Sequence, residues 1–164
     1  MKDLLPKIIF ILFGISLLVY LSFPNLNFPD PLPGAYQSGE PADVETPLRR
    51  GYYTDMTRAE VISWYRNQFK WGILLNYPPE NAQEVIRDQT KSTFLQEVVH
   101  PFRESIYING FEPQTDEYKL VINGTTYRQK VIVRYVENPV WLRLAVGVAT
   151  LGLIYVLYKE YKKV

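Results

Sequence analysis

The chain has 164 residues, which is the length of one domain, and carries 18 Lys and Arg against 17 Asp and Glu. This near-neutral balance gives no electrostatic basis for a nucleic-acid partner. The absence of cysteine excludes disulfides, thiolate nucleophiles, Cys-ligated zinc and iron–sulfur clusters, and an exported domain without disulfides favours a prokaryotic source.

The first apolar stretch runs from Leu4 to Phe23 and contains a single charge, Lys7. At about 1.5 Å per residue, such a stretch crosses a hydrocarbon core of roughly 30 Å. The residues after it lack the small-residue pattern of a signal-peptidase site, so we expect an uncleaved signal anchor. Lys2 and Lys7 precede the span and the next basic residue is Arg49, which predicts a cytosolic end at residues 1–7 and transmembrane helix 1 at residues 8–23.

The next segment, residues 24–48, is rich in proline and poor in large apolar side chains. Its six prolines are Pro24, Pro29, Pro31, Pro33, Pro41 and Pro47. Such a composition predicts a semi-extended tether. A long tether would leave the first span free to lie apart from the second.

Residues 49–137 have the composition of a folded domain. Thr57 and Glu60 have the spacing of a capping box, which predicts a helix start. Apolar residues then recur at helical spacing from Val61 to Phe69. A short strand is expected at Ile73–Tyr77 and a second helix from Pro78, whereas Phe94–Val99 is compatible with either helix or strand.

The clearest signal is Asn123-Gly124, because this dipeptide favours a two-residue hairpin turn between strands Tyr118–Ile122 and Thr125–Val136. Alternation along the second strand predicts one apolar face and one basic face. Together with Ser105–Asn109, these strands predict an α+β fold, with two helices on a mostly antiparallel sheet of about three to four strands.

Val140–Tyr158 is the second apolar stretch, and Trp141 and Tyr155 fit the aromatic belts of a membrane span. Arg143 lies in its first turn, where its side chain can reach toward headgroups. We therefore expect transmembrane helix 2 at residues 140–158 and a basic cytosolic tail at residues 159–164. The domain between the spans, with 12 Lys and Arg against 15 Asp and Glu over residues 24–139 (a net charge of −3), would lie outside a cytoplasmic membrane.

Basic residues follow the predicted hairpin on one face and form the best surface feature of the sequence. This basic stripe consists of Lys119, Arg128, Lys130 and Arg134. It is a candidate site for anionic headgroups, a wall polymer or an acidic partner, although a solvated sheet face would look the same. Among the aromatics Tyr52, Tyr53, Trp64 and Trp71, which suit either core packing or stacking on a partner, Trp64 falls at the flank of its helix.

Small residues share one face of the second span, at Ala145, Ala149 and Gly152, and Gly14 offers a weaker counterpart in the first. Such a face lets membrane helices approach closely. Small residues are also common in these helices without any such role.

No motif in the sequence selects a catalytic, metal or cofactor site. His100 is the only histidine and lies before Pro101 in an expected loop, where a structural role is the simpler interpretation. Nothing in the spacing selects an acid–base pair among the domain's carboxylates, which include Asp55, Glu60, Asp88, Glu97 and Glu104. There is also no Gly-rich phosphate loop or nucleophile elbow.

Three functional hypotheses remain. The leading hypothesis is a non-catalytic structural or assembly subunit, whose outer domain binds a protein partner in a prokaryotic envelope complex. The second is a membrane-anchored binding or sensing module for an anionic lipid, a wall polymer or a small ligand. The third, an enzyme of the outer face, would need a cleft lined by His100 or two of the carboxylates.

Overall fold

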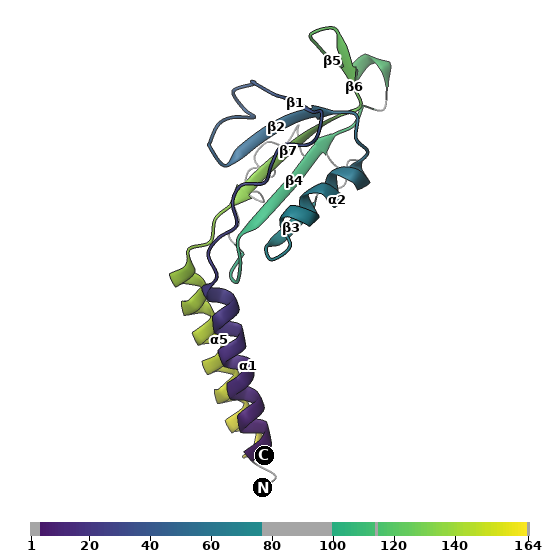
Figure 1. Cartoon of the computed structure of the whole chain (residues 1–164). Helices are drawn as coiled ribbons and strands as arrows, with labels where there is room; N and C mark the ends of the chain where they lie inside the picture. The colour runs from purple at the N-terminus through teal and green to yellow at the C-terminus, as the bar shows by residue number, and fades with distance from the viewer. Residues whose placement is uncertain (1–3, 77–99, 114, 164) are drawn as a thin grey trace. The chain divides into compact units, whose positions relative to one another are not determined.

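Figure 1 shows the computed structural model of the chain, which describes residues 4–76, 100–113 and 115–163. The expected helix from Pro78 and the ambiguous segment Phe94–Val99 lie outside these residues. The fold is α+β, with three described α-helices and a mostly antiparallel sheet. The chain divides into two compact units, which are described separately. Unit 1 comprises Met1–Asn25, His100–Arg103 and Glu137–Val164, and unit 2 comprises Leu26–Val99 and Glu104–Val136.

Unit 1 is built on two helices, α1 (Leu4–Ser22) and α5 (Val140–Tyr161), which run side by side (Figure 1). Both helices are long and apolar enough to cross a membrane. The sequence leaves contact between the two spans open, and in the structure α1 packs directly against α5. Their contact surface is described below with the candidate sites.

Unit 2 contains a five-stranded sheet in the order β1-β2-β7-β4-β3, and the strands run antiparallel except for the parallel pair β3–β4. The strands are β1 (Tyr36–Gln37), β2 (Arg49–Thr54), β3 (Ile73–Asn76), β4 (Ser105–Phe111) and β7 (Gln129–Val136). Helix α2 (Arg58–Gln68) contributes Val61 and Tyr65 to the same core as Ile106 and Val133 of the sheet. Among the described residues, the domain core therefore includes the space between α2 and one face of the sheet.

The predicted alternation is confirmed over β7, where residues from Gln129 to Tyr135 alternate between buried and half-buried. Val131, Val133 and Tyr135 face the core, and Lys130 and Arg134 face the opposite side. A strand with this period of two can bury only one set of side chains against α2. The register of the sheet is thus fixed by the apolar set.

The hairpin turn is also confirmed, because Asn123 and Gly124 both have positive φ, at 52° and 79°. The long strand predicted after the turn is interrupted, however. It forms β6 (Thr125–Tyr127), which pairs with β5 (Leu120–Ile122) in a separate two-stranded sheet after a short 3-10 helix (Asp116–Tyr118), and then β7. The break falls at Arg128, whose backbone N–H donates to Asp55 Oδ1 at 3.0 Å.

The predicted capping box opens α2. Glu60 N–H donates to Thr57 Oγ1 at 3.3 Å, and Thr57 N–H donates to Glu60 Oε2 at 2.7 Å. Two amides that the helix cannot satisfy internally therefore have partners.

The proline-rich segment is not the extended tether that its composition predicts. Leu32 is buried in the core, with Leu26 and Phe28 packed against it, and β1 adds an edge strand to the sheet. Tyr135 Oη donates to the Leu26 carbonyl at 2.8 Å. The apolar side chains spaced among the prolines therefore help to hold the segment on the domain.

Candidate functional site

Two members of the basic stripe, Lys119 and Arg128, form ion pairs with carboxylates that lie 3 and 16 residues away in the chain. Lys119 Nζ lies 3.1 Å from Asp116 Oδ1, and Arg128 Nε lies 2.8 Å from Glu112 Oε1. Both pairs are solvent-exposed, and pairs of this kind contribute little to stability. They do lower the net positive charge that a headgroup or an acidic partner would meet.

Lys130 lies between two carboxylates of the loop that follows β1. Its Nζ is 2.8 Å from both Glu40 Oε2 and Asp43 Oδ2. Burial alone would lower the pKa of Lys130, but the hydrogen bonds with Asp43 and Glu40 outweigh it and the pKa is raised. The same lysine lowers the pKa of Glu40, together with the hydroxyl of Tyr53.

The loop carrying Glu40 and Asp43 packs closely onto the sheet. A Cβ at Gly51 of β2 would lie 2.7 Å from the Asp43 carboxylate, so this position requires glycine. Arg134, the fourth stripe residue, donates to the hydroxyl of Thr46 in the same loop. The second face of the sheet was predicted to be solvated or to bind something acidic, and here the acidic group is a loop of the chain itself.

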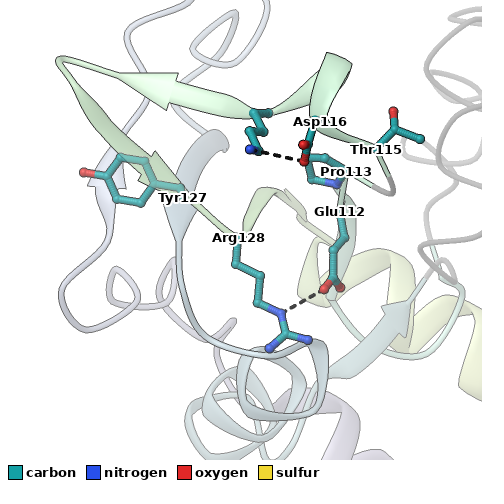
Figure 2. Close-up of a pocket in the computed structure, with 7 residues that line it drawn as sticks. Glu112, Pro113, Thr115, Asp116, Tyr127 and Arg128 are labelled. Atoms are coloured by element: carbon teal, nitrogen blue, oxygen red, sulfur yellow. Dashed lines mark hydrogen bonds and ion pairs between the residues drawn. The ribbon is translucent and has the colours of Figure 1, made fainter.

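A shallow hollow of about 260 Å³ lies beside the β5–β6 hairpin (Figure 2). Figure 2 shows Arg128 reaching toward Glu112, with Tyr127 on the other side of the hollow. Its charged lining is balanced, because Arg128 and Lys119 each hold a carboxylate. The side chain of Asp116 on the rim of the hollow is 93% exposed. The hollow is therefore open to solvent on this side.

The aromatic candidates separate by burial. Tyr52 and Tyr53 are buried at 2% and 4% exposure, which removes them as stacking platforms. Trp64 is half-buried against the core, and its Nε1–H donates to the Asp30 carbonyl at 3.4 Å. Trp71 is 63% exposed.

Sequence reasoning missed an aromatic cluster that spans three strands, formed by Tyr36 of β1, Tyr53 of β2 and Tyr127 of β6. Ring centroids are 6.4 Å apart for Tyr36–Tyr53, 6.5 Å for Tyr36–Tyr127 and 6.0 Å for Tyr53–Tyr127. Tyr53 is buried beneath, whereas Tyr36 is 42% exposed and Tyr127 is half-exposed. We call these three residues the tyrosine patch. Only the pairing of β1 with β2 brings Tyr36 opposite Tyr53, and no local pattern reveals that pairing.

Unit 1 contains two deeply buried arginines at the carboxyl end of α1. Arg103 donates from Nη1 to the Tyr20 and Phe23 carbonyls at 3.2 and 3.4 Å, and from Nη2 to the Pro24 carbonyl at 3.4 Å. Arg143 donates from Nη2 to the Phe23 carbonyl at 2.9 Å. Their exposures are 1% and 0%, so the expectation that Arg143 reaches toward headgroups is wrong. We call Arg103 and Arg143 the arginine clamp.

The small residues predicted for helix packing are divided by the structure. Gly14 of α1 faces Leu151 of α5, where an added Cβ would lie 3.4 Å from Cδ1. The close contact was missed and lies at Gly147, where a Cβ would lie 2.5 Å from Leu21 Cδ1. Ala145, Ala149 and Gly152 are exposed on another side of α5, so their packing against a further helix stays a prediction.

The described residues that were considered for catalysis accept hydrogen bonds from backbone amides at separate places in the fold. Asp55 and Glu60 accept backbone amides, as described above, and Glu104 is fully buried and accepts the Leu26 N–H at 3.0 Å. His100 Nδ1 accepts the Phe102 N–H at 3.3 Å, and burial lowers the pKa of the imidazole. Asp88 and Glu97 lie outside the described residues. Within the described part of the chain, no group of three or more His, Asp or Glu is placed to hold a metal ion.

No protein-family model matches the sequence, and no curated protein or solved structure is significantly similar to it.

Proposed function

We propose that the protein is a two-span protein of a prokaryotic cytoplasmic membrane, and that unit 2 is a non-catalytic extracytoplasmic domain that binds another envelope protein. The observation that carries the proposal is the apolar exterior of the α1–α5 pair. The exposed large apolar side chains of both helices, which include Ile11, Phe13, Val148 and Leu153, are 41–81% exposed. Such a surface is stable in hydrocarbon and is a liability in water.

The predicted orientation is supported by the basic residues at one end of the helix pair. Lys7 belongs to the first turn of α1, and Lys159, Lys162 and Lys163 follow the apolar part of α5. The two helices run antiparallel, so these lysines belong to the same end (Figure 1). An excess of lysine beside a span favours the cytosolic side of the membrane.

The interaction role is supported by the tyrosine patch. Tyrosine gives a large, rigid contact area and is enriched in the energetic centres of protein interfaces. Tyr118 and Val121 of the adjoining segment are also exposed, at 49% and 54%. A protein partner is favoured over an anionic polymer, because Lys119, Arg128 and Lys130 already hold carboxylates.

Topology can be tested directly because the chain has no cysteine. Cysteine replaces Val44 of the domain or Lys163 of the tail, and intact cells are treated with a membrane-impermeant maleimide. We expect labelling of Val44→Cys in intact cells and of Lys163→Cys only after the cells are permeabilised. The reverse pattern would disprove the orientation.

Partner binding can be tested by placing a photoreactive phenylalanine analogue at Tyr36 or Tyr127 of the full chain, in membranes of the source organism. The matched control is Val44, which is 39% exposed against 42% for Tyr36. We expect one adduct of constant mass at both tyrosines and none at Val44. Equal adducts at all three sites, or none at the tyrosines, would contradict the proposal. If Arg128→Glu with Lys130→Glu instead abolishes retention on anionic lipid or wall material, the polymer-binding alternative is correct.

A further inference from the structure

The carboxyl end of α1 carries partial negative charge that positive donors can stabilise. The last carbonyls of a helix have no partner within the helix and form the negative end of its dipole. Ser22 is the last residue of α1, and the carbonyls of Tyr20, Phe23 and Pro24 lie at this end. The arginine clamp supplies positive donors to all three.

Arginine is suited to this task because the planar guanidinium carries five N–H donors in a fixed fork. Arg103 uses the fork on three carbonyls and also lies over the Tyr20 ring, 5.2 Å from the centroid. Arg143 shares the Phe23 carbonyl with it. Charge-assisted hydrogen bonds in a buried environment are among the strong ones.

The clamp is also the first of three contacts that follow one another along the helix pair. Arg143 meets Phe23, Gly147 meets Leu21, and Leu151 meets Gly14. The α5 residues are spaced by four, so they lie on one helix face. Only one sliding register of two antiparallel helices satisfies all three contacts.

The clamp gathers three segments of unit 1 that are distant in the sequence. They are the end of α1, the start of α5 and the loop His100–Arg103, whose His100 carbonyl also accepts from Asn138 Nδ2. In the chain, Arg103 is followed closely by β4, and Asn138 follows the end of β7. The two strands pair Ser105 with Val136 at that end. A sliding movement of α1 along α5 would move the carbonyls at the end of α1 away from Arg103 and Arg143, and it must therefore release the clamp.

We propose that Arg103 and Arg143 are positioning residues that lock the two membrane helices in a single register, and that the clamp is the element any movement of the spans must open. This proposal rests on the proposed function for the membrane setting only. It requires neither a partner nor a particular orientation.

The test uses a disulfide reporter in the otherwise cysteine-free full chain, reconstituted in lipid nanodiscs. Gly14→Cys with Leu151→Cys reports the native register, because these positions are in contact. Gly14→Cys with Leu153→Cys is the negative reporter, because Leu153 is 60% exposed. The readout is the rate of intramolecular disulfide formation under a mild oxidant.

We expect Arg143→Ala or Arg103→Ala to slow the native cross-link by about tenfold, as the loss of one strong charge-assisted contact implies. The negative reporter should stay slow, because Leu153 is two residues from Leu151 and lies on the opposite face of α5. Arg143→Lys keeps the charge but not the fork and should recover only part of the rate. Arg66→Ala, at an exposed position of α2, should leave the cross-linking rate unchanged.

A native cross-linking rate retained in both alanine variants would overturn the proposal. If an alanine variant does not accumulate, the lysine variants provide the test. A wild-type cross-linking rate in both Arg103→Lys and Arg143→Lys would overturn the proposal that the guanidinium groups lock the register. Failure of the proposed function is recognised separately, because the maleimide labelling reports orientation and the photo-cross-link reports the partner.

Discussion

The two units of this chain differ in the kind of residue that each one buries. In the described part of unit 1, the buried side chains are Leu21, Arg103, Asn138 and Arg143, and the buried glycines are Gly14 and Gly147. In unit 2 the core consists of Val, Ile, Leu, Phe and Tyr, as in Val61, Ile106 and Val133. Unit 1 exposes the same apolar residue types that unit 2 buries.

This difference is the one expected if unit 2 folds in water and the helices of unit 1 lie in hydrocarbon. In water, apolar area is the main quantity that folding removes from solvent. In hydrocarbon, apolar area gains nothing from burial, so close packing of small residues and satisfied polar groups hold helices together. The arginine clamp and Gly147 fit the second case, and the core around α2 fits the first.

The largest effect is expected in the core of unit 2. Ile106 is fully buried, so Ile106→Ala should lower the free energy of unfolding by about 2–5 kcal/mol through lost burial and the cavity left behind. The measurement is urea unfolding of the full chain in micelles, followed by tryptophan fluorescence. Val121→Ala on the exposed hairpin should change the same quantity by no more than about 0.5 kcal/mol.

A charge placed on the exterior of α1 tests which solvent that surface meets. Leu12 is 59% exposed, and in a membrane Leu12→Asp should cost about 2.5–3.5 kcal/mol in apparent insertion free energy. The matched control is Val121→Asp, at 54% exposure, which should be nearly neutral. The fraction of chain that resists carbonate extraction is the readout. Equal tolerance of both charges would refute the membrane assignment of α1.

Overpacking tests the contact between the helices. Gly147→Leu should destabilise the α1–α5 pair by about 1–3 kcal/mol, because even a Cβ there would lie 2.5 Å from the buried Leu21. Gly152→Leu should be tolerated, since nothing described lies within 4 Å of its Cβ. Thermal melting in nanodiscs measures both variants. A larger loss in Gly152→Leu would show that a further helix packs on that side.

Acid should weaken unit 2 through the ion pair of Glu40 with Lys130. Because the folded-state pKa of Glu40 is lowered below 4.5, its interaction with Lys130 stabilises the fold above that pH and is lost as the pH falls through the lowered value. The described contacts of the clamp join guanidinium groups to backbone carbonyls. Unfolding measured between about pH 6 and 3 should show a small acid-dependent loss in wild type that is reduced in Glu40→Gln.

The features that could be predicted from the sequence are those encoded within a few neighbouring residues. Thr57 and Glu60 cap α2, Asn123-Gly124 makes its turn, and the alternation from Gln129 to Tyr135 fixes the inner face of β7. Both apolar helices were expected from length and composition. Each of these signals acts through backbone geometry or through a period of the chain.

What could not be predicted depends on contacts between residues far apart in the chain. Lys130 was a candidate for binding an external anion, but its partner Glu40 lies in a segment that composition alone assigned to a tether. The breadth of the sheet was underestimated for the same reason, because β1 and β2 precede the hairpin that defined the expected fold. Arg103 carried no signal at all, since its role exists only once α1 ends beside it.

Because Leu26, Phe28 and Leu32 complete the hydrophobic core, the domain boundary lies immediately after the first helix and not at Arg49. A secreted fragment beginning at Arg49 would lose the contacts of Tyr135 with Leu26 and Phe28 and should aggregate, whereas one beginning at Leu26 retains them. For the same reason, resistance of residues 26–37 to added protease would indicate folding and would not by itself place that segment inside the cell.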